Sequence, residues 1–132
     1  MSAELYWLTL TALMTSLFWL PYILNRLLEM GVIPAVMNPN ADTTPAAPWA
    51  KRMMRAHTNA VENLVVFAPL AIAVHVTNMS TSLTAGAAAT YFFARLAHFL
   101  VYSLGIPLLR TVTFAIGVAC QIILAITLLQ II

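Results

Sequence analysis

Residues 111–132 read TVTFAIGVACQIILAITLLQII and contain no charged side chain. A helix of about 20 predominantly apolar residues is long enough to cross a bilayer. The stretch from Leu5 to Asn25 is equally free of charge. The whole chain is 62% hydrophobic and 8% charged, with a mean hydropathy of +0.92, far outside the range of soluble domains. The sequence therefore predicts an all-α integral membrane protein.

The remaining predicted spans flank the polar run TNMSTS at residues 77–82. The tract between Glu62 and Arg95 carries no charge but is too long for one helix, so we predict two helices joined by a tight turn. A loop near 29–51 follows the first helix, because its four prolines break helical structure. The expected fold is a single membrane domain, residues 1–132, forming a four-helix transmembrane bundle with helices near 4–28, 52–78, 82–104 and 110–131.

The first helix is expected to be retained, since its head MSAELYW has an acidic residue and no lysine or arginine, unlike a cleaved signal peptide. Cys120 falls inside the last predicted span and is the one cysteine, so a disulfide within the chain is excluded. The net charge of +2 comes from basic residues scattered around helix ends. Such scatter makes no nucleic-acid-binding surface.

The basic residues indicate topology. The turn at residues 75–85 has no lysine or arginine. On the opposite side, basic residues surround the long loop or stand at the start of the fourth helix: Arg26, Lys51, Arg52, Arg55 and Arg110. Cytoplasmic loops carry an excess of lysine and arginine. We therefore expect the long loop in the cytoplasm and both termini outside.

A polar stripe interrupts the second predicted span, in RAHTNAVENL at residues 55–64. At 100° per residue Arg55, Asn59 and Glu62 share one face, Asn63 lies beside them, and His57 points elsewhere. A charge facing lipid at mid-helix costs roughly 2.5–3.5 kcal/mol, so these groups should face protein or a wet cavity. Taken alone, the stripe is explained equally well by structural ion pairing and by a ligand site.

The third span carries a second polar face, which favours the ligand site. Its members recur at spacings 4, 3 and 4: Tyr91, Arg95, His98 and Tyr102. Arg26 and Arg110 add cations at the same end. These groups are too many for one ion pair, and we expect an arginine-rich pocket for a small zwitterionic polyanion. No metal is expected, because the three histidines lack metal-ligand spacing and no cysteine joins them.

RAHTNAVEN (55–63), RLAHFLVY (95–102) and LLRTVTF (108–114) resemble the corresponding helices of the membrane-associated proteins in eicosanoid and glutathione metabolism, the MAPEG family. The resemblance covers essentially the whole chain. It implies a homotrimer with glutathione, the co-substrate, bound between subunits near the cytoplasmic face. The ligands implied within one subunit are Arg55, Asn59, Glu62, Asn63, Arg95, His98 and Tyr102, those implied from the neighbour are Arg26 and His57, and Arg110 is implied to stabilise the glutathione thiolate.

Some positions depart from the eicosanoid branches of that family. Asn63 stands where leukotriene synthase has a tyrosine, and Thr111 and Phe114 stand where prostaglandin E synthase has a serine and a tyrosine. The resemblance is closer to the microsomal glutathione transferases. It implies a detoxification enzyme, a transferase or peroxidase that acts on a lipophilic second substrate within membrane lipid. The compact length is typical of a bacterial inner-membrane member.

Two other functions compete with this one. The first is a non-catalytic relative, a lipid-binding scaffold or a subunit of a membrane complex, in which the helix-start arginine only anchors to the interface. The second is a small four-helix multidrug exporter. That class needs an acid deep in its first span, whereas Glu4 and Glu29 lie at the ends of this one.

Overall fold

The computed structural model describes residues 1–37 and 44–132, which are helical apart from short connections. The helices are α1 (Ala3–Leu17), α2 (Leu20–Met30), α3 (Val32–Met37), α4 (Pro48–Val76), α5 (Ser82–Ser103) and α6 (Pro107–Leu128). The predicted loop near 29–51 thus contains α3 and the first residues of α4, and its residues 38–43 lie outside the described part.

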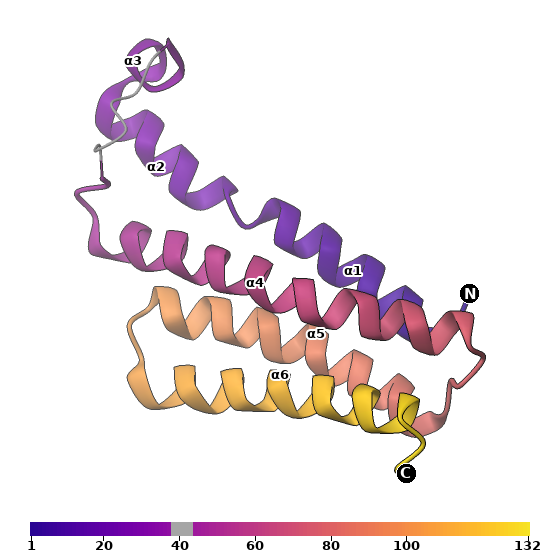
Figure 1. Ribbon diagram of the computed structural model, residues 1–132. Coiled ribbons are helices and arrows are strands. Elements are labelled where there is room, and N and C mark those ends of the chain that lie inside the picture. Colours follow the sequence, from indigo (N-terminus) through magenta and orange to yellow (C-terminus); the bar gives the residue numbers. More distant parts are fainter. Residues whose placement is uncertain (38–43) are drawn as a thin grey trace.

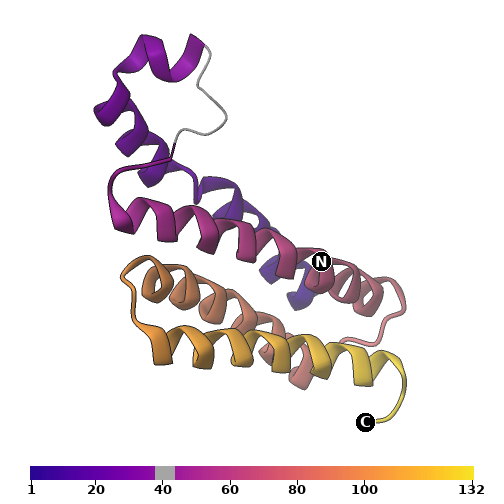
Figure 2. The same cartoon turned by 60° about the vertical axis from the view of Figure 1, so that its left-hand side comes forward.

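Helices α1, α4, α5 and α6 lie side by side, with α5 packed against each of the other three (Figure 1). Helix α2 contacts α4, and α3 contacts α2, so residues 20–37 form an arm that leans away from the other helices (Figure 2). The α2–α3 arm and the α5–α6 connection lie at one end of the molecule, and both termini lie at the other (Figure 1). The regions predicted to be rich in positive charge therefore share one end.

Two apolar clusters hold these helices together. The first is centred on the stacked rings of Phe67 and Tyr91, whose centroids are 3.8 Å apart. The second is centred on Phe18 and Phe99, stacked at 3.7 Å. Stacked aromatic pairs add to the free energy gained by burying their area. The first cluster joins α1, α4, α5 and α6, and the second joins the end of α1 to α4 and α5.

The first predicted helix, near 4–28, corresponds to the segment Ala3–Met30, which the structure divides into α1 and α2 at Phe18 and Trp19. Pro21 has no amide hydrogen to donate to the carbonyl of Leu17, and its ring crowds the preceding turn. The amide of Phe18 bonds instead to the carbonyl of Thr15 at 3.3 Å, which tightens the end of α1. The break redirects α2 and so carries Arg26 away from α5 and α6.

Glu4 stabilises the end of the molecule at which both termini lie. Its side chain is fully buried, and its carboxylate accepts hydrogen bonds from Ser80, at 2.9 Å to each oxygen, and from Thr84. Thr84 also belongs to the capping box that begins α5, with Thr81 as its N-cap residue. The start of α1 is thereby bonded to the α4–α5 turn.

The opposite end is fastened by Arg52 of α4. Its Nε donates to the carbonyl oxygen of Ser103 at 2.9 Å, satisfying one of the free carbonyls at the end of α5. Gly105 follows with φ +77°, and a Cβ there would lie 3.2 Å from the Arg52 guanidinium. Both the backbone angle and the close approach therefore require glycine at the α5–α6 connection.

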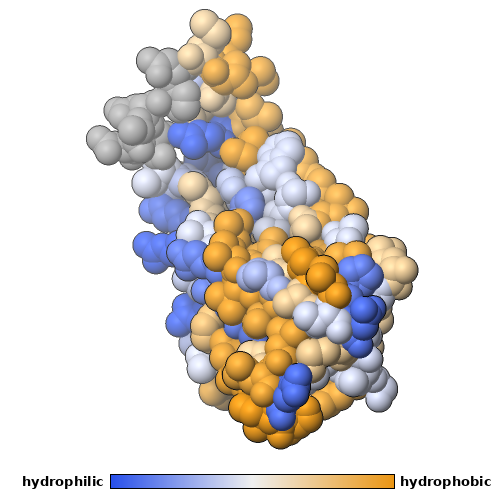
Figure 3. All heavy atoms as spheres, turned by 45° about the vertical axis from the view of Figure 1, so that its right-hand side comes forward, coloured by the Kyte–Doolittle hydropathy of each residue, from blue (hydrophilic) through white to orange (hydrophobic). Residues whose placement is uncertain are grey.

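Within residues 1–37 and 44–132, three segments are long and apolar enough to cross a membrane: Ala3–Met30, Pro48–Val76 and Pro107–Leu128. Figure 3 shows a surface dominated by hydrophobic side chains, with hydrophilic ones gathered in separate patches. Four spans were predicted, and three meet this criterion. Helix α5 has sufficient length at 22 residues, but its polar residues Arg95 and His98 lower its hydropathy. Those two side chains are buried, so α5 turns its polarity inward.

Candidate functional site

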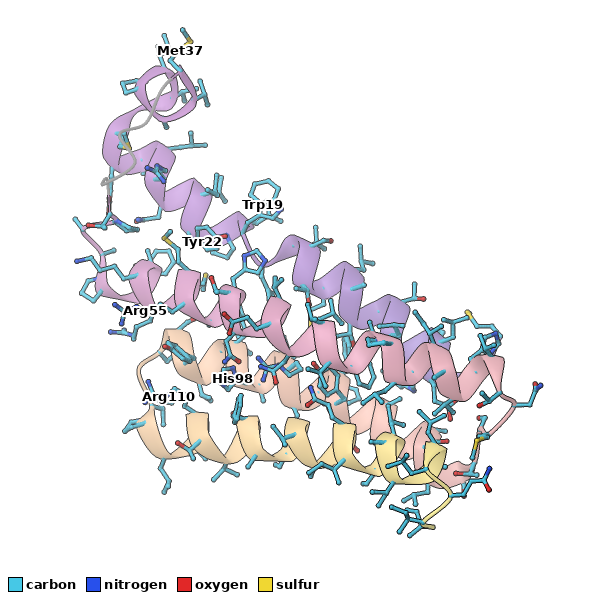
Figure 4. The ribbon with its side chains drawn as sticks, viewed as in Figure 1. Trp19, Tyr22, Met37, Arg55, His98 and Arg110 are labelled. Carbon is cyan, nitrogen blue, oxygen red and sulfur yellow. The ribbon has the colours of Figure 1, made fainter. Side chains whose placement is uncertain are left out.

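Two cavities adjoin each other where α4 faces α5 and α6. The larger, about 460 Å³, is lined by Met54, Arg55, Thr58, Asn59, Glu62 and Tyr102. The smaller, about 200 Å³, is lined by Asn59, His98, Tyr102, Arg110, Thr111 and Phe114. Asn59 and Tyr102 line both cavities, which are therefore two parts of one site at the arm end of the molecule. Figure 4 shows Arg55, His98 and Arg110 in this region, contributed by α4, α5 and α6.

The larger cavity contains the polar stripe of α4. Arg55, Asn59 and Glu62 line it together because spacings of 4 and 3 place them on successive turns of one helix face. Arg55 and Glu62 are both exposed, and no ion pair joins either to a side chain in residues 1–37 or 44–132. The stripe is thus not neutralised within the described part of the protomer, and its cation and anion are available to a zwitterionic ligand.

The smaller cavity contains Arg110, four residues into α6. Its guanidinium carbon lies 5.0 Å from the centroid of the Tyr102 ring, a cation–π contact that holds the head group over the site. The main-chain amide of Arg110 is already bonded to the carbonyl of Ile106 at 3.2 Å. Arg110 can therefore contact an anion only through its guanidinium group. His98, buried beneath, contacts the ring of Tyr102 with a centroid separation of 5.6 Å.

Arg95 and Asn63, both predicted ligands, line neither cavity. Arg95 is 1% exposed and lies below Asn59, to which its Nη2 donates at 2.5 Å. Its Nη2 also lies 3.4 Å from Nδ1 of His98. Asn63 donates from Nδ2 to the main-chain oxygen of Asn59 at 2.9 Å and to Oδ1 at 3.2 Å. The structure therefore places both residues behind Asn59.

Arg26 and His57 lie apart from both cavities. His57 faces α2, and its Nδ1 is hydrogen-bonded to the Tyr22 hydroxyl at 2.8 Å. Arg26 lines a small enclosed space with Tyr22, Glu29 and other residues of the arm and of α4. The predicted site residues thus form two groups on opposite sides of α4, one at the paired cavities and one beside the arm.

Sequence reasoning missed the roles of Tyr22 and Arg52. Tyr22 lies 35 positions before His57, and nothing in the sequence links the two residues. Arg52 was interpreted as a topology signal only, although its spacing of three from Arg55 places both near one helix face. In the structure Arg52 instead bonds to Ser103 and fixes the connection that leads to Arg110.

Sequence comparison identifies the family of this chain. A model of the MAPEG family matches residues 5–130, nearly the whole chain, and the protein belongs to that family. The resemblance carried by the helix motifs is thereby confirmed. With its three apolar helices, the protein is an integral membrane protein of a family that includes glutathione transferases and related enzymes. No curated protein and no solved structure matches the chain.

Proposed function

We propose that the protein is a membrane-bound glutathione transferase that acts on lipophilic electrophiles. The observation that carries this proposal is the pair of cavities that share Asn59 and Tyr102 and hold Arg55 at one side and Arg110 at the other. Glutathione has two carboxylates, one ammonium group and one thiol. The cavities offer cations for its anions and the carboxylate of Glu62 for its ammonium group.

Arg110 is proposed to stabilise the thiolate. A cation beside a thiol lowers its pKa, and the thiolate is the nucleophile. In conjugation the thiol proton passes to water, and the thiolate sulfur forms a bond to an electrophilic carbon of the second substrate. The bond to the leaving group breaks, and that group departs with the electron pair. Helix α6 contributes because the start of a helix also favours an anion.

The proposed assembly is a homotrimer in which α5 serves as the fourth membrane span. The exposed Arg55 and Glu62 on α4 have no charged partner in the described protomer, and leaving such groups in lipid is costly. A neighbouring subunit that covers this face would supply protein contact and bring Arg26 and His57, which lie on the other side of α4, toward a shared site. The arm end is proposed to face the cytoplasm of a bacterial inner membrane, with the termini outside.

A non-catalytic, lipid-binding relative is the second candidate. The cation–π contact between Arg110 and Tyr102 favours it, since this contact would also serve to anchor α6 at the membrane interface. Such a protein would bind no glutathione thiolate. The multidrug exporter is disfavoured, because Glu4 is bonded to Ser80 and Thr84 at the end of the molecule and is not placed deep in a span.

The test is activity of the purified protein with glutathione and an aromatic halide, with a lipid hydroperoxide assayed in parallel. Arg55→Ala and Glu62→Ala should each weaken glutathione binding by roughly 1.5–3 kcal/mol, the contribution of one charge-assisted hydrogen bond. Mass measurement in detergent establishes the oligomer. A protein that is only monomeric would contradict a site shared between subunits. Unchanged glutathione affinity in both variants would mean that Arg55 and Glu62 have a structural role.

A further inference from the structure

Asn59 is one of the two side chains that line both cavities, and its amide group has an accepting and a donating end. A guanidinium has donors only. The atom that lies 2.5 Å from Nη2 of Arg95 must therefore be the oxygen Oδ1. The orientation of this amide follows from the chemistry of its partner.

A second contact holds the same orientation. The main-chain oxygen of Asn59 can only accept, so the Asn63 atom 2.9 Å from it must be the donating Nδ2. That Nδ2 also donates to Oδ1 of Asn59 at 3.2 Å. Nε2 of Gln121 on α6 in turn donates to the carbonyl of Asn63 at 3.2 Å. Side chains of α4 and α5 thus converge on one side of the Asn59 amide, while Gln121 of α6 bonds to the main chain of the neighbouring Asn63.

The other end of the Asn59 amide remains available. In the described residues its Nδ2 makes no hydrogen bond, and it is not among the buried polar atoms that lack a partner. Because Asn59 lines both cavities while Oδ1 faces Arg95 and Asn63, the side chain presents Nδ2 to the ligand space.

We infer that Arg95 and Asn63 are positioning residues that hold Asn59 as a hydrogen-bond donor toward the ligand. This inference rests on the proposed glutathione site, and it specifies which kind of ligand group lies beside Asn59. The ligand group beside Asn59 is an acceptor, namely a carboxylate, a thiolate or a peptide carbonyl. The ammonium group of the ligand is excluded from that position and lies toward Glu62.

The surroundings of Arg95 fit a residue that acts through Asn59. Nε and Nη1 of Arg95 are buried and have no hydrogen-bond partner among the described residues, so Nη2 makes the hydrogen bonds of this side chain. A buried cation with so few partners would gain from a carboxylate at the position of Oδ1.

That expectation gives a test without any ligand. Asn59→Asp should raise the thermal unfolding midpoint of the purified protein, because the carboxylate becomes the counter-ion of Arg95. In an Arg95→Met background the same substitution should lower the midpoint, since the carboxylate then lacks its cation. A decrease of equal size in both backgrounds would overturn the contact between Arg95 and residue 59, on which the assigned orientation depends.

Glutathione affinity tests the positioning role. Arg95→Met should weaken binding by about tenfold, the effect of about 1.4 kcal/mol, in the otherwise unaltered protein. In an Asn59→Ala background, Arg95→Met should not weaken glutathione binding any further, because Arg95 acts on the ligand only through the Asn59 side chain. Arg95→Lys, which keeps a donor, should recover most of the affinity. Ser16→Ala removes an exposed hydroxyl on α1, outside both cavities, and serves as the control, with unchanged affinity.

Additive losses in that cycle would overturn the inference, because they would mean that Arg95 contacts glutathione directly. Asn63→Ala, at a partly exposed position, provides an independent arm if Arg95→Met does not fold, and its loss of affinity should likewise vanish in the Asn59→Ala background. A wild-type protein that binds no glutathione would contradict the proposed function, whereas the unfolding midpoints would still decide the orientation of Asn59.

Discussion

Two buried charges, Glu4 and Arg95, have opposite surroundings. The Glu4 carboxylate is fully buried and both of its oxygens accept hydrogen bonds from hydroxyl groups. The Arg95 guanidinium is equally buried, but in the part of the chain that the structure describes its Nε and Nη1 have no hydrogen-bond partner. Burial of a charge is costly unless hydrogen bonds compensate it, so the two cannot have the same role.

We attribute this difference to a structural role at the Glu4 end of the molecule and to the proposed ligand site at the Arg95 end. Glu4 bonds α1 to the α4–α5 turn, and its contacts account for its burial. Arg95 lies next to the paired cavities and supports Asn59, which lines them both. Substitutions at the Glu4 end should therefore change stability, whereas substitutions at the cavity end should change ligand binding and turnover.

The largest expected effect is that of Arg110→Ala on turnover. The loss of the cation beside the thiolate should lower the conjugation rate by about 100-fold, comparable to removing one preorganised oxyanion donor. The thermal midpoint should hardly change, because Arg110 is exposed. Arg110→Lys should retain part of the rate through its charge. Normal turnover by Arg110→Ala would show that the thiol is activated elsewhere.

Glu4→Ala should lower the stability of the protein and leave its turnover unchanged, the reverse of Arg110→Ala. Loss of the acceptor for Ser80 and Thr84 should lower the free energy of unfolding by about 2 kcal/mol. The folded variant should keep its rate per active site, since Glu4 lies at the other end of the molecule. Denaturation in detergent and activity of the folded fraction provide the measurements. Ser16→Ala, at an exposed hydroxyl on the same helix, is the control. A change in rate without a change in stability would contradict the division between the two ends.

The smallest expected effect distinguishes two glycines. Gly105→Ala should lower the free energy of unfolding by about 1 kcal/mol, because φ is +77° and the new Cβ would approach Arg52 to 3.2 Å. Gly86→Ala should be neutral or stabilising, since nothing lies within 4 Å of a Cβ there and alanine favours a helix. Thermal midpoints of both variants, measured side by side, check the difference. Equal losses would mean that the Gly105 turn imposes no special requirement.

Much of the fold follows from composition and periodicity. The uncharged stretches 5–25 and 111–132 lie within segments that the structure shows to be long and apolar enough for spans. The break at Phe18 and Trp19 was missed because hydropathy does not register a single proline in an apolar run. Helix α5 shows a related limit, since hydropathy counts its polar residues without regard to whether they face lipid or protein.

The candidate site was predictable to a similar extent. Helical spacing correctly placed Arg55, Asn59 and Glu62 at one cavity. It could not show that Arg95 lies beneath the cavity, because periodicity specifies a face of a helix and not the depth of a side chain. Nor could it show that His57 bonds to Tyr22, since this contact depends on how α2 leaves the break. Such contacts between distant parts of the chain arise only from packing.

The most direct test of the proposed function is the ultraviolet difference absorbance of glutathione bound to the purified protein at neutral pH. We predict a thiolate band in the wild type and its loss in Arg110→Ala, while Arg110→Ala still binds glutathione through the remaining site residues. The absence of a thiolate band in the wild type, or an identical band in Arg110→Ala, would contradict the proposed role of the paired cavities.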